Sequence, residues 1–154
     1  MITNFEYTMI TTLNRGLDGN TIHITATKAF NQVYSRAKLA AFIAKFFHRS
    51  NQLEILASQP LTSSRSNNRI ISVPIRQIKG TLGRSEDFDS SFSPLNERSR
   101  NRWISVATAY LLNIPLPAVE LVQVGQAYYV RDGHHRISVA KAFRQEVIDA
   151  CIVN

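Results

Sequence analysis

The sequence predicts an α+β fold with a mainly helical N-terminal extension, and two kinds of periodicity support this. Apolar residues recur at helical spacing in two long segments, 27–48 and 95–113. Four shorter segments have the length and the β-branched or aromatic content of strands. They are 70–75, 119–124, 127–131 and 147–153. With 154 residues, of which 44% are hydrophobic, the chain is long enough to bury a core of its own.

A polar segment at 59–68 predicts the division of the chain, because it is rich in residues that interrupt regular structure. We predict an N-terminal extension at 1–69 and a main domain at 70–154. The net charge of +7 is unevenly divided: the extension has 8 Lys/Arg and 3 Asp/Glu, and the domain has 10 and 8. A basic surface favours anionic partners, so DNA is one expected partner, mainly of the extension.

The helix predicted at 27–48 is apolar on two faces. One face holds Phe30, Val33, Tyr34, Ala37, Ala41 and Ala44. The other holds Leu39, Phe42, Ile43 and Phe46. One face can pack on the core, and the second face needs another element or another subunit. Simple burial and a homodimer through the 27–48 helix are both open, as are a strand and a helix start for residues 21–25.

The elements of the main domain follow from breaker residues and alternation. Pro74 places the strand at 70–75 at a sheet edge or a strand end. Residues 80–84 predict a turn, and the acidic and aromatic segment 85–94 predicts a structured loop. A two-residue turn at 125–126, with glycine first, predicts a hairpin between the strands on either side of it.

The most informative stretch is 128–143, where a strand passes through a glycine turn into a helix. The amide groups at a helix start have no partner within the helix, and the helix dipole adds positive charge there. This geometry favours an anion, often a phosphate. The stretch therefore predicts a phosphate-binding corner.

Each residue of the turn suits this chemistry. Asp132 can cap the helix, and Gly133 allows a ligand to approach the backbone. His134 and His135 can bind a phosphate or transfer a proton, and Arg136 offers a planar set of donors to phosphate oxygens. The alternative is a helix cap with an exposed basic turn and no ligand.

Two motifs together resemble those of the ParB/sulfiredoxin superfamily. The first runs from Val73-Pro74-Ile75 through Ile78 to Arg84. The second is the Gly-x-x-Arg of Gly133 and Arg136, followed by a helix of small residues. The resemblance covers residues 70–153 and implies a mixed sheet with packed helices. It is strongest to a stand-alone ParB-like nuclease domain, similar to the N-terminal domain of ParB.

The departures from the family pattern bear on activity. Sulfiredoxins have a nucleophilic cysteine where this chain has His134, so sulfinic-acid reduction is not expected. The turn also looks like that of free-serine kinases with this fold, which implies binding of a nucleotide (ATP, ADP or CTP) with Mg²⁺. By this resemblance Arg84, Gly133, His135 and Arg136 would bind phosphates. Asp132, His134 and Glu86 would be the catalytic residues of a kinase or nucleotide hydrolase.

Other functions stay open at this point. One alternative is a DNA-binding ParB-like module without catalysis, and a third is a nuclease. The acidic residues Glu86, Asp87 and Asp89 have an alternative too, as a solvated surface that balances nearby arginines. The histidines lack the spacing of a zinc site, so no metal ligands are predicted within the chain.

The N-terminus has no basic segment followed by an apolar one, so we expect a cytoplasmic protein. The longest apolar-rich run, 39–47, is too short to span a bilayer and contains Lys45. We therefore expect no membrane among its partners.

Overall fold

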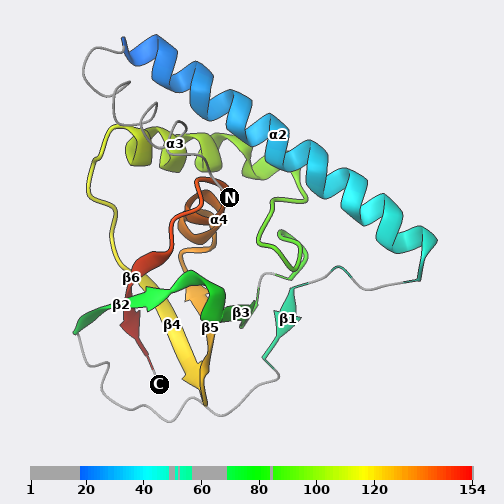
Figure 1. The fold of residues 1–154 in the computed structure, drawn as a ribbon, viewed down its shortest axis with the longest axis vertical. Coiled ribbons are helices and arrows are strands. Elements are labelled where there is room, and N and C mark those ends of the chain that lie inside the picture. The colour runs from blue at the N-terminus through cyan, green and yellow to red at the C-terminus, as the bar shows by residue number, and fades with distance from the viewer. Residues whose placement is uncertain (1–17, 49–50, 52, 57–68, 84, 154) are drawn as a thin grey trace.

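The computed structural model describes residues 18–48, 51, 53–56, 69–83 and 85–153, which form one sheet covered by helices on one side (Figure 1). The strands are β1 (Glu54–Ile55), β2 (Ile70–Pro74), β3 (Ile78–Thr81), β4 (Val119–Val124), β5 (Ala127–Asp132) and β6 (Val147–Ile152). The α-helices are α2 (Gly19–Phe46), α3 (Arg100–Leu111) and α4 (His134–Ala142). Two 3₁₀ helices, η1 (Ile75–Gln77) and η2 (Glu97–Ser99), complete the described elements.

The sheet has six strands in the order β1-β3-β5-β4-β6-β2. The hairpin β4–β5 and the pair β2–β6 are antiparallel, whereas β1–β3, β3–β5 and β4–β6 are parallel. The predicted α+β class with a mixed sheet and an N-terminal helix is therefore confirmed. The hairpin turn at 125–126 and the edge position of the strand that ends at Pro74 are confirmed as well.

Helix α4 lies between the sheet and the other helices, and both of its faces are buried (Figure 1). Ile137 belongs to the core against the sheet, together with Leu121 and Val130. Val139 belongs to a second core formed by α2 and α3. The indole Nε1 of Trp103 donates to Ser138 Oγ at 2.8 Å, which fixes α3 on α4. The start of α4 is therefore held in a defined place relative to the sheet.

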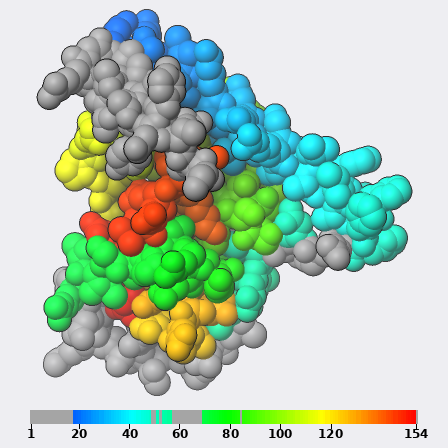
Figure 2. Space-filling view, in the orientation of Figure 1, coloured from blue at the N-terminus to red at the C-terminus, as the bar shows by residue number. Residues whose placement is uncertain are grey.

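Helix α2 begins at Gly19, eight residues before the predicted start at residue 27. Residues 21–25 are helical because Ile22 and Ala26 are buried against α3. The C-terminal end of α2 extends past the rest of the molecule (Figures 1 and 2). No helix within the described residues is long and apolar enough to cross a bilayer.

Two further predicted boundaries were wrong. Gly80 and Thr81 belong to β3 rather than to a turn, because Gly80 permits close approach of the β1 backbone: a Cβ there would lie 2.2 Å from the carbonyl oxygen of Glu54. The helix predicted from residue 95 begins as η2 and becomes α-helical only at Arg100. Leu95 is held outside it, since its amide donates to the carbonyl of Asp87.

The division of the chain after residue 69 stays a prediction, because segment 59–68 lies outside the described residues. The described parts on the two sides of this segment are in contact. Strand β1 pairs with β3 in the sheet, and α2 packs on α3.

Candidate functional site

The corner between β5 and α4 requires a glycine. Gly133 is the N-cap of α4 and has φ 103° and ψ 19°, a left-handed conformation that side chains disfavour. A Cβ at this position would lie 2.5 Å from Val119 Cγ1, which is in the core. The first helical bond runs from the Ile137 amide to the Gly133 carbonyl at 3.0 Å. No side chain caps this helix start.

Arg136 connects the corner to the chain that leads into β4. Its guanidinium donates to the carboxylate Oδ2 of Asp132 at 2.7 Å and to the carbonyl of Ala118 at 2.8 Å. It also donates to the carbonyl of Pro117. These bonds use three of its five N–H donors, and its side chain is only 16% exposed. Arg136 therefore has a structural role that the sequence did not reveal, and phosphate binding by its remaining donors stays a prediction.

His134 is buried behind the corner, with 4% of its surface exposed. Its Nε2 lies 2.7 Å from Thr81 Oγ1, and this hydroxyl also accepts the amide of Gly83 at 3.1 Å. The ring stacks on Phe88 with centroids 5.8 Å apart. Through these contacts, His134 connects the start of α4 to β3. Its predicted catalytic role stays a prediction.

Phe88 brings the acidic loop to the corner. Besides stacking on His134, it meets the ring of half-buried His135 edge-on at 5.2 Å. Glu86 lies two residues earlier on this loop and is exposed. Asp87 forms an ion pair with Arg98 at 2.7 Å, and this bond raises the pKa of Arg98. The alternative of an acidic loop balanced by arginines therefore holds for Asp87.

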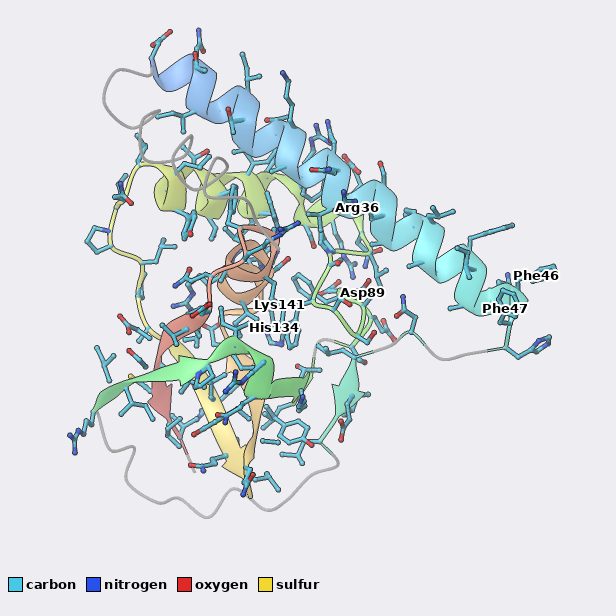
Figure 3. The ribbon with its side chains drawn as sticks, in the orientation of Figure 1. Arg36, Phe46, Phe47, Asp89, His134 and Lys141 are labelled. Atoms are coloured by element: carbon cyan, nitrogen blue, oxygen red, sulfur yellow. The ribbon has the colours of Figure 1, made fainter. Side chains whose placement is uncertain are left out.

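The alternative of a solvated acidic surface is wrong for Asp89, because this residue is buried. Its Oδ1 accepts the amides of Ser91 and Ser93 at 2.9 and 2.8 Å and so shapes the loop. Lys141 of α4 lies in the same region, with Nζ 4.5 Å from the ring centroid of Phe92 (Figure 3). Burial lowers the pKa of Lys141, and the charge of Asp89 offsets part of this effect.

A cavity of about 240 Å³ opens at the corner. Its walls are Arg102 and Val106 from α3, Leu116 and Pro117 before β4, and the turn 132–136. Arg102 is exposed and makes no ion pair within the described residues. Arg102 is 30 residues or more from the turn in sequence, and the packing of α3 on α4 brings it to the turn.

A second cavity, of about 410 Å³, shares Leu116, Pro117 and Arg136 with the first. Tyr110 and Phe143 also line it, and their rings stack with centroids 5.1 Å apart. The polar corner is thus adjacent to an aromatic surface.

The predicted site residues are partly brought together. Asp132, Gly133, His134, His135 and Arg136 share the corner. Arg84 lies outside the described residues. Across the described residues, no three His, Cys, Asp or Glu side chains gather as metal ligands.

No protein-family model matches the chain, and no curated protein sequence is significantly similar to it. Among solved structures, the crystal structure of sulfiredoxin from Arabidopsis thaliana is similar, with 18% identity and a TM-score of 0.42. The match covers 55% of this chain and 83% of that chain. This TM-score is too low to carry an argument, so the fold class rests on the strands and helices described above. Assignment as a ParB-like nuclease domain stays a prediction.

Proposed function

We propose that the corner at the start of α4 binds the phosphate group of a nucleotide. The observation that carries the proposal is the left-handed Gly133 at an uncapped helix start, beside a cavity lined by arginine. Amides at a helix start and the helix dipole attract an anion without any conformational change. The cavity volume of about 240 Å³ suits a phosphate group better than a whole nucleotide.

Charge at the cavity supports an anionic ligand. Arg102 and Arg136 contribute two permanent cations, against one carboxylate from Asp132 that Arg136 already pairs with. Arg102 lines the cavity and has no ion-pair partner among the described residues. It is the side chain best placed to neutralise an added phosphate.

The adjacent cavity supports a nucleotide rather than inorganic phosphate. An organic group attached to the phosphate would meet Tyr110 and Phe143 beyond the shared wall of Leu116 and Pro117. Aromatic rings stack on nucleobases with little base preference. The proposal therefore names a nucleotide class and no particular base.

The proposal concerns binding. Phosphoryl transfer would need a group that accepts a proton from the attacking hydroxyl or water. Asp132 is held by Arg136, His134 is buried against Thr81, and Glu86 is exposed on the acidic loop. Catalysis by these three residues remains a prediction, and so do DNA binding and nuclease activity.

Calorimetric titration of the full chain with ATP, ADP, CTP and inorganic phosphate, each with and without Mg²⁺, tests the proposal. We expect at least one nucleotide to bind, and Arg102→Ala to weaken its affinity about tenfold, the effect of one charge-assisted hydrogen bond. Arg76→Ala is the matched control, since Arg76 is also exposed and lies outside the walls of both cavities. It makes the same change in net charge.

Two results would contradict the proposal. One is the absence of binding by the wild type to every ligand at low salt. The other is equal weakening by Arg102→Ala and Arg76→Ala, which would indicate attraction to net charge and no defined site.

A further inference from the structure

The free end of α2, which we define as Leu39, Phe42, Ile43, Phe46 and Phe47, exposes a large apolar surface. These side chains are between 46% and 74% exposed. Phe46 and Phe47 lie at the end of the helix that extends past the sheet and the other helices (Figure 3). Contiguous apolar surface of this kind marks a site of interaction.

The apolar residues form a single stripe that faces away from the body. Leu39, Phe42, Ile43 and Phe46 have the spacing i, i+3, i+4, i+7. Ala37 is buried on the side of α2 that faces the body, and Phe46 follows it by about two and a half turns. The stripe is therefore on the opposite side of the helix from its own core.

Cations flank this stripe, and anions are absent from it. Lys38 and Lys45 are a heptad apart and lie along one edge, and Arg36 lies along the other. In the sequence there is no Asp or Glu between Asp18 and Glu54. An apolar stripe with basic edges can bury its aromatic rings while its lysine side chains extend toward negative charge.

This charge pattern argues against a second copy of the chain as the occupant. In an antiparallel pair of helices each edge meets its own equivalent, so Lys38 and Lys45 would face lysines. In a parallel pair the lysine edge would face the edge of Arg36. Like charges across an interface are unfavourable in either orientation, and the free end supplies no carboxylate to relieve them.

We propose that the free end of α2 binds the surface of an anionic lipid bilayer. The aromatic and aliphatic side chains would enter the interface between headgroups and acyl chains, and Arg36, Lys38 and Lys45 would contact lipid phosphates. This contact departs from the sequence-based expectation of no membrane partner, which considered only segments that span a bilayer. The contact is peripheral, and is compatible with the finding that no described helix is long and apolar enough to cross a bilayer. It is also independent of a ligand at the α4 corner.

Flotation of the full chain with lipid vesicles tests this inference. We expect the protein to float with vesicles of phosphatidylcholine and phosphatidylglycerol at low salt, and to remain unbound with phosphatidylcholine alone. Phe42→Ser/Phe46→Ser should reduce binding by about tenfold or more, because the variant lacks the two aromatic rings that would be buried in the bilayer. Lys38→Gln/Lys45→Gln should weaken binding and make it less sensitive to added salt.

Two control variants separate this inference from other effects. Ile55→Thr/Ile70→Thr removes two exposed apolar side chains on the outer strands of the sheet, and should float like the wild type. Arg102→Ala should float like the wild type too, because the vesicle contact does not use the α4 corner.

Three results would overturn the inference. They are no flotation with anionic vesicles, equal flotation with both kinds of vesicle, and equal flotation of Phe42→Ser/Phe46→Ser and the wild type. A dimer in analytical ultracentrifugation that Phe42→Ser/Phe46→Ser dissociates would assign the stripe to a second copy instead.

Discussion

The start of α4 and the free end of α2 are both basic, but they use their charge differently. At the α4 corner, Arg136 is committed to Asp132 and to backbone carbonyls. At the free end of α2, Lys45 is exposed and has no carboxylate near it in the sequence. Net charge alone therefore does not locate a binding surface. A cation with partners belongs to the fold, and a cation without them can meet a ligand.

The same distinction applies within the corner. Arg136 has the position that the sequence motif indicates for phosphate binding, yet most of its donors serve the structure. Arg102 is not part of that motif, and it lines the cavity without an ion-pair partner among the described residues. Matched substitutions in α4 and α2 test this difference between bonded and unbonded cations.

The largest effect is expected at Gly133. Gly133→Ala should lower the free energy of unfolding by at least about 2 kcal/mol, because it combines a left-handed backbone with a clash against Val119. Gly19→Ala at the start of α2 meets no atom within 4 Å and should be neutral or slightly stabilising. Urea denaturation of both variants measures the difference. Equal stabilities would show that the corner relaxes easily.

A smaller effect is expected from Arg136→Lys. The guanidinium reaches the two carbonyls from Nη1 and Asp132 from Nη2, whereas lysine has a single nitrogen in place of this planar pair. We expect a loss of about 1–2 kcal/mol in the free energy of unfolding. Arg36→Lys on the exposed face of α2 should change it by less than about 0.5 kcal/mol. If the two variants are equally stable, Arg136 is not a structural residue.

The smallest effect is expected from Lys141→Met, and it depends on pH. Burial lowers the pKa of Lys141, so the unfolded chain holds this proton more tightly than the folded one. The wild type therefore gains stability as pH rises through the lowered folded pKa toward the usual value of 10.5.

Lys141→Met should be more stable than the wild type near neutral pH by less than about 1 kcal/mol, because Lys141 keeps part of its contact with solvent. This advantage should shrink at alkaline pH. Lys45→Met is the control, because it makes the same substitution at an exposed position. Thermal unfolding across pH measures both, and an advantage of Lys141→Met that grows with pH would contradict this account.

Much of the fold could be predicted from sequence, because it depends on local patterns. The Gly125-Gln126 turn determines a hairpin, and alternation and Pro74 indicate an edge strand. The position of β1 could not be predicted, since a two-residue strand has no periodicity and pairs only because Gly80 lets it approach.

The candidate site could be predicted only in part, because only some of its residues are adjacent in sequence. Residues 132–136 are adjacent in sequence and stay together in the fold. Arg102 and Phe88 reach the turn through tertiary packing, of which the sequence gives no local sign. The extent of bonding by Arg136 was also hidden, since its carbonyl partners lie 18 and 19 residues away.

Backbone amide resonances of the full chain, followed during titration with the tightest-binding nucleotide, show where a phosphate binds. We expect the largest shift changes on residues 133–136 at the start of α4, and we expect Arg102→Ala to diminish them. Shift changes centred on the lysines of α2, with residues 133–136 unaffected, would contradict a phosphate site at this corner.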